Sequence, residues 1–176
     1  MIRAICALLI AAGAATPSYG GLIGSTVDLK THFPDLGTTH GDMGSVTVDP
    51  STEFVAITDY VGFLADVSDL KISIVFEGST ATAFGSAQFN GFEFAFSGVT
   101  ITGASVDASS DFSPRQVSIQ GNSIFLDYAG ISVPAHSFSV INVTSSETPE
   151  PGTLALLAAP VAALICRSRR STRSAQ

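Results

Sequence analysis

Two histidines and two aspartates lie within eleven residues of one glycine-rich stretch: His32, Asp35, His40 and Asp42. They form the densest group of potential metal ligands in the chain. Zinc accepts imidazole nitrogens and carboxylate oxygens, and a catalytic zinc needs three such ligands and an open position. The alternative is that both aspartates form turns and both histidines face solvent, because aspartate is a common turn residue. The turn interpretation is favoured, and the metal site is kept as a hypothesis.

Further acidic residues gather on expected loops, where they suit calcium better than zinc. Asp66 and Asp69 form one such pair, and Asp107 and Asp111 form another. Calcium prefers hard oxygen ligands. No segment matches a calcium-binding loop motif or repeat, so the expectation is no cofactor, with calcium as the alternative.

Nucleophilic catalysis has little support in these residues. The two cysteines, Cys6 and Cys166, lie near the two ends of the chain, and no serine has the G-x-S-x-G context of a hydrolase. Tryptophan is absent, although sugar-processing sites usually use such rings. The prediction is that the protein is not an enzyme.

Charge divides the chain into a basic tail and an acidic middle. Residues 21–146 hold three basic and thirteen acidic side chains, a formal charge of −10, whereas the whole chain carries −7. Nucleic-acid binding depends on basic contacts to phosphates, so this class of partner is excluded.

The elements that must position these residues are short strands. β-branched and aromatic runs alternate with turn residues, and no stretch has a helical period. Phe92, Phe94 and Phe96 alternate with small or polar residues, which predicts a strand with one buried face. Expected strands are 23–30, 44–49, 53–59, 69–76, 80–90, 92–102, 115–120, 123–128 and 137–144. The fold predicted is all-β, an antiparallel β-sandwich of jelly-roll-like form.

Turn residues separate the expected strands, and one dipeptide among them is expected to form a hairpin. Asn90-Gly91 lies between two aromatic runs and is the strongest hairpin candidate, because this dipeptide favours a tight two-residue turn. Gly121-Asn122 separates two further runs.

The first 20 residues have the layout of a secretory signal peptide. One charge, Arg3, precedes an apolar run that is too short to span a bilayer. Cleavage is expected after Gly20, with Ala14 or Ala15 as the alternative. Residues 1–20 are thus assigned as a signal peptide read by the general secretion machinery, and 21–146 as the body.

Residues 147–176 form a tripartite tail. Pro149, Glu150 and Pro151 precede an apolar run over 154–166, and a basic cluster follows: Arg167, Arg169, Arg170 and Arg173. As a helix the apolar run reaches only about 20 Å, against a hydrocarbon core of about 30 Å. Pro160 also removes a backbone donor midway. The tail is therefore expected to be a transient membrane segment whose arginines stop on the cytoplasmic side.

This order of motif, apolar helix and arginines resembles the PEP-CTERM sorting signal of Gram-negative bacteria that produce exopolysaccharide. The resemblance implies an exosortase-like membrane processing enzyme as partner. It also implies brief residence in the inner membrane, followed by release to the envelope, surface or extracellular matrix. The match covers about 28 residues at the end of the chain.

The body resembles a group of PEP-CTERM proteins on two further motifs. These are the Phe33 to Gly37 stretch and the Phe-Asn-Gly-Phe sequence at 89–92. The group has no assigned activity, so the resemblance implies architecture alone. The expected function is a non-enzymatic surface or matrix protein. The alternative is a calcium-dependent or carbohydrate-binding adhesive module of the exopolysaccharide layer.

Overall fold

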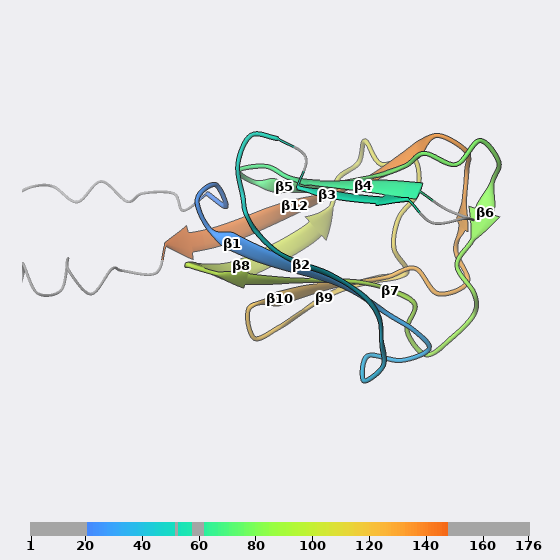
Figure 1. Ribbon diagram of the computed structural model, residues 1–176, viewed down its shortest axis with the longest axis horizontal. Helices are drawn as coiled ribbons and strands as arrows, with labels where there is room; N and C mark the ends of the chain where they lie inside the picture. Colours follow the sequence, from blue (N-terminus) through green and yellow to red (C-terminus); the bar gives the residue numbers. More distant parts are fainter. Residues whose placement is uncertain (1–20, 52, 58–61, 148–176) are drawn as a thin grey trace, which may run out of the picture.

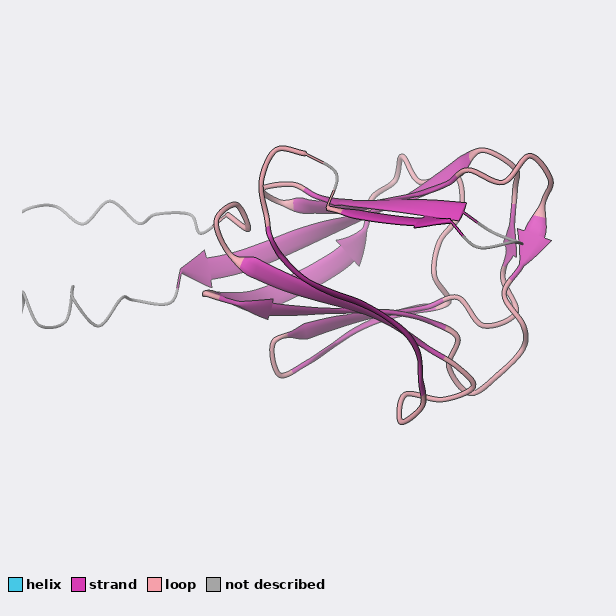
Figure 2. Ribbon diagram, viewed as in Figure 1, coloured by secondary structure: helices cyan, strands magenta, loops and turns pink. Residues whose placement is uncertain are grey.

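A computed structural model describes residues 21–51, 53–57 and 62–147. This part of the chain forms two five-stranded antiparallel sheets that pack face to face as a sandwich-like body (Figures 1 and 2). The strands are β1 (Thr26–His32), β2 (Thr39–Thr47), β3 (Phe54–Ile57), β4 (Gly62–Val67), β5 (Lys71–Phe76), β6 (Thr82–Ala83), β7 (Gly91–Ser97), β8 (Val99–Val106), β9 (Gln116–Gln120), β10 (Ser123–Asp127), β11 (Ser132–Val133) and β12 (Ser137–Glu147).

Sheet A has the order β2-β1-β7-β10-β9, and sheet B has the order β3-β4-β5-β12-β8. A separate small ladder joins β6 to β11. The all-β, antiparallel sandwich prediction is confirmed at this level. No helix in the described residues is long and apolar enough to cross a membrane. The signal-peptide and sorting-tail predictions fall outside the described residues.

Alternating side chains of both sheets build the core between them. On β7 the phenylalanines at 92, 94 and 96 are buried, as their spacing predicts, and β1 contributes Val27 and Leu29. Sheet B contributes Ile72 and Ile74 from β5. Burial of these side chains removes apolar surface from water, which is the main driving force for folding. The core therefore fixes which face of each strand remains outside.

Two predicted strands are corrected by the structure. The run 92–102 is divided between the two sheets, because β7 lies in sheet A and β8 in sheet B. Gly98 makes the corner between them with a φ of 84°, a conformation that glycine adopts without steric cost. The run 80–90 contributes only the two residues of β6 to a strand.

The Asn90-Gly91 hairpin prediction is wrong, because β7 pairs with β1 and β10 rather than with the segment before it. Asn90 instead donates its side-chain amide to the carbonyl of Gly85 and accepts the backbone N–H of Tyr128. The predicted turn at Gly121-Asn122 is confirmed. Gln120 pairs with Ser123, which leaves the two-residue turn of Gly121 and Asn122 between β9 and β10.

Tyr128 is a buried core residue in the loop that follows β10. Its ring is fully buried beside the ring of Phe84, and its hydroxyl bonds the hydroxyl of Ser139 at 3.0 Å. Burial raises the pKa of the Tyr128 phenol, because the charged form loses hydration. Tyr128 is thereby a structural residue linking the loop after β10 to β12.

Candidate functional site

His32 ends β1 with its side chain on the outer face of sheet A, opposite to the inward-facing Val27 and Leu29. Its ring is only 5% exposed, and its Nε2 lies 2.8 Å from Oε2 of Glu93 on β7. Its Nδ1 is buried and has no hydrogen-bond partner within the described residues. His32 is thus held by a carboxylate and by surrounding rings.

The other three predicted ligands lie elsewhere. Asp35 and Asp42 each accept the N–H of the glycine two residues later, at 2.9 Å, as turn-forming aspartates do. His40 is exposed and lines a cavity of about 350 Å³ with Thr31 and Phe92, whose side chains point between the sheets. The two histidines therefore have different surroundings: the His40 ring lies against Phe33, whereas the His32 ring lies against Glu93 and Phe89.

The four residues consequently do not converge on one point. Across residues 21–51, 53–57 and 62–147, no three histidine, cysteine, aspartate or glutamate side chains form a group that could hold a metal ion. Spacing in the sequence suggested a cluster, but the fold distributes the four residues over β1, the turn after it and β2. The arrangement supports the turn interpretation of Asp35 and Asp42.

The two motifs that carry the resemblance of the body meet over the outer face of sheet A. The N–H of Phe89 donates to the carbonyl of Pro34 at 3.0 Å. The Phe89 ring lies 6.3 Å from the rings of His32 and of Phe125 on β10. Phe89 and Phe125 are both buried although they lie outside the main core. The rings of His32, Phe89 and Phe125 thus pack together on this face, beneath the loops after β1 and before β7. This group of rings is called the aromatic cover.

Asp127 holds the adjoining loops through its carboxylate. Its Oδ1 accepts the backbone N–H groups of Asn90 and Ala129, at 3.2 and 2.9 Å. Its Oδ2 accepts the Nε of Arg115 at 3.0 Å and also one terminal nitrogen of the same guanidinium. Arg115 in turn donates to the carbonyl of Gln88. Sequence reasoning missed this residue, because nothing in its local pattern separates it from other turn aspartates.

A groove of about 250 Å³ lies beside this cover, along the outer side of β9. Val117 points into the core and pairs with Leu126, so residues 116, 118 and 120 face outward. The groove is lined by Leu36, Gln88, Phe89, Gln116, Ser118, Gln120 and Asp127. All three glutamines of residues 21–147 are among these lining residues. The groove is the candidate binding site of the body.

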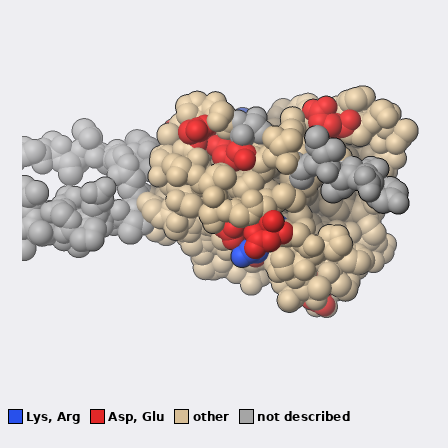
Figure 3. All heavy atoms as spheres, in the orientation of Figure 1, with Lys and Arg blue, Asp and Glu red and all other residues tan. Residues whose placement is uncertain are grey.

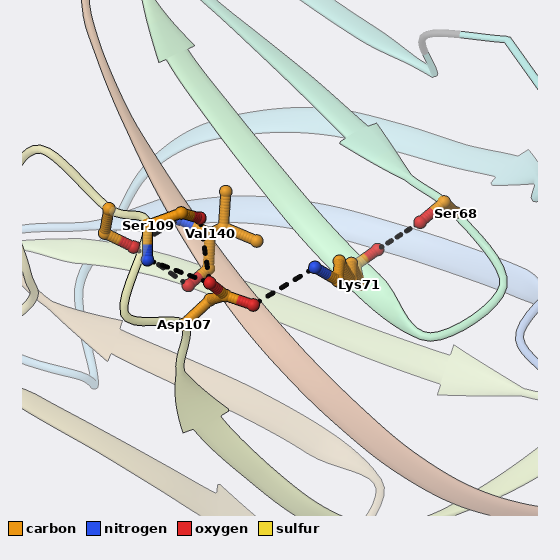
Figure 4. A network of polar contacts seen from close by, with 6 residues as sticks. Ser68, Lys71, Asp107, Ser109 and Val140 are labelled. Atoms are coloured by element: carbon orange, nitrogen blue, oxygen red, sulfur yellow. Dashed lines mark hydrogen bonds and ion pairs between the residues drawn. The ribbon is translucent and has the colours of Figure 1, made fainter.

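One of the two acidic pairs considered for calcium, Asp107 and Asp111, has other partners. Asp107 accepts the Nζ of Lys71 at 3.1 Å, and accepts the N–H and hydroxyl of Ser109 at 2.9 and 2.8 Å (Figure 4). Asp111 instead accepts the backbone N–H of Phe138. These contacts connect β5, the loop after β8 and β12. They account for both carboxylates without a cation.

Acid is expected to weaken this network. Hydrogen bonds from the backbone and side chain of Ser109, and from Lys71, hold the pKa of the Asp107 carboxyl below its usual range. A depressed folded pKa stabilises the folded state above the unfolded value of 3.8, and this contribution is lost as pH falls below it. Asp107→Asn should therefore show a smaller loss of melting temperature between pH 5 and pH 2 than the unaltered chain. Equal losses in thermal melts would contradict this.

Charge on the visible face is dispersed. Acidic atoms occur there in separate small groups, one of them beside a basic side chain, and most of the surface is uncharged (Figure 3). The chain matches no protein-family model, no curated protein and no solved structure. The chemistry of its own residues must therefore indicate what the body does.

Proposed function

We propose that this chain is an exported, non-enzymatic protein of the cell surface or extracellular matrix, processed through its Pro149-Glu150-Pro151 signal. The observation that supports the proposal is that both ends of the described body lie at one end of the sandwich (Figure 1). Thr26 at the start of β1 pairs with Ser97, and Glu147 at the end of β12 pairs with Val99 just beyond the Gly98 corner. An amino-terminal export signal and a carboxyl-terminal membrane tail can thus both leave from one end.

This arrangement leaves the loops at the other end unobstructed. The aromatic cover and the turn after β1 lie at the end of sheet A far from Thr26, where His32 pairs with Gly91. A tail held in a membrane would present these loops to the surroundings. The jelly-roll-like form, the exosortase-like enzyme and the final position in the envelope or matrix belong to the same proposal.

Mass spectrometry of material recovered from the cell surface tests the processing step. The expected result is a protein that lacks the residues after the Pro149-Glu150-Pro151 region. Triple replacement of these residues by alanine should retain the arginine-rich end in the membrane fraction. The matched control replaces Ser145 and Ser146, just before the motif, and should be processed normally. Surface material that still ends at Gln176 would overturn the proposal.

A second candidate function is an adhesive module, and the groove along β9 favours its carbohydrate-binding form. The calcium-dependent form has no group of ligands in the described residues. Thermal melts separate the two forms, because a ligand that binds only the folded state raises the melting temperature. An increase with millimolar calcium, reversed by chelator, would support the calcium-dependent form. An increase with saccharide alone would support the other.

A further inference from the structure

We propose that the groove along β9 binds a neutral saccharide chain through Gln88, Gln116 and Gln120. This proposal deepens the function proposed above, because a surface or matrix protein meets such polymers, but it concerns binding rather than export. The three glutamines come from two distant segments, the loop before β7 and strand β9. The fold brings them to one groove although nothing in the core requires their side chains.

The polar groups of the groove are suited to hydroxyl groups. Each glutamine amide offers two donors and an acceptor, and the hydroxyl of Ser118 offers one donor and acceptor sites. The side chains of these four residues make no hydrogen bonds within the described residues. A saccharide presents vicinal hydroxyls that both donate and accept, so it can satisfy paired amide groups. A purely apolar ligand would leave these groups without partners.

Charge in the groove argues for a neutral ligand. Among the described residues, Asp127 is the one ionisable residue that lines the groove, and its carboxylate is occupied by Arg115 and two backbone N–H groups. None of these lining residues is basic, so none offers a positive charge to an acidic sugar. The body is also acidic overall, so an anionic polymer would be repelled. Hydrogen bonding, rather than ion pairing, is therefore expected to select the ligand.

The shape of the groove suits part of a long chain rather than an enclosed small molecule. Residues 116, 118 and 120 are spaced along one edge strand and span about 13 Å, at about 3.3 Å per residue. The side chain of Leu36, which is 39% exposed, supplies apolar surface among the residues that line the groove. Sugar rings have an apolar C–H face that can pack there while their hydroxyls meet the amides.

The test is binding of the purified full chain to a panel of polysaccharides in affinity gel electrophoresis. Dextran, a soluble β-glucan and a mannan are the neutral probes, and alginate is the anionic probe. Retardation by at least one neutral probe, with weaker retardation by alginate, is the expected result. The double variant Gln116→Ala with Gln120→Ala should bind about tenfold more weakly, as the loss of one to two net hydrogen bonds predicts.

Two controls separate loss of the site from loss of the fold. Ser105→Ala changes an exposed residue of sheet B and should leave retardation unchanged. Gln120→Glu keeps the size of the side chain but removes its donors, and its cross-strand partner is the uncharged Ser123, so it should weaken binding while the melting temperature is maintained. The proposal is overturned if no neutral probe retards the chain, or if the double variant binds as the unaltered chain does. Either result leaves the processing proposal untouched, because that proposal depends on the mass of the surface form.

Discussion

Replacing Gly91 by alanine is expected to destabilise the body by about 3 kcal/mol, the upper part of the range for overpacking a well-packed interior. A Cβ atom at this position would lie 1.9 Å from the carbonyl oxygen of Leu126 and 3.0 Å from its carbonyl carbon. These are backbone atoms of β10, the neighbouring strand, so they cannot move aside as a flexible side chain can. The chain must instead shift β7 away from β10.

Urea unfolding followed by circular dichroism measures this effect as a lower midpoint. Gly85→Ala is the matched control, because the nearest atoms to its Cβ would be the side-chain atoms of Asn90 and Phe33 at 3.7 and 3.8 Å. These are ordinary contact distances, so the control should unfold near the midpoint of the unaltered chain. Equal midpoints for Gly91→Ala and Gly85→Ala would show that the close approach of β7 and β10 is not structurally important.

The second large effect is expected from Asp127→Ala, which should also cost about 3 kcal/mol. The change leaves the N–H groups of Asn90 and Ala129 without their acceptor, and a buried donor without a partner costs about 1–3 kcal/mol. The lost contact with Arg115 adds less, because the Arg115 side chain is about half exposed and solvent screens it. The loops before β7 and after β10 should loosen together.

Asp127→Asn is the informative companion variant. It keeps one acceptor oxygen for the two backbone N–H groups but removes the charge that Arg115 meets, so an intermediate loss is expected. Asp28→Ala is the matched control, because Asp28 contacts Lys30 in a partly exposed ion pair on the outer face of β1 and should change the unfolding midpoint little. A loss for Asp28→Ala as large as that for Asp127→Ala would contradict the role given to the buried contacts.

Period-two alternation predicted the strands well wherever one face meets the core. The residues at 92, 94 and 96 are buried as predicted, and the Gly121-Asn122 turn joins β9 to β10. The same reasoning failed for residues 80–90, because the aromatic residues of this segment lie in loops. Phe84 packs on Tyr128, and Phe89 packs on the outer face of sheet A. Strand β4 was missed because turn-like residues surround its short run.

The candidate site was predicted less well than the fold. The residues from His32 to Asp42 suggested a metal site because they are close in sequence, yet His32 contacts Glu93 whereas the His40 ring contacts Phe33. The groove was not predicted, because its glutamines are separated by 28 residues between positions 88 and 116. Such residues carry no local pattern that marks them as neighbours.

The amino-acid sequence by itself determined the all-β class and the acidic charge of the body, and it carries the end patterns from which export and sorting are proposed. These features follow from the amino-acid composition and from the short-range spacing of apolar residues, and neither depends on which strands pair. Only the tertiary structure decided that β7 lies between β1 and β10, and that Gln88 meets Gln116 and Gln120 in one groove. Strand pairing is set by packing of core faces between distant segments, so the same alternation is compatible with many strand orders until the sheets close on each other.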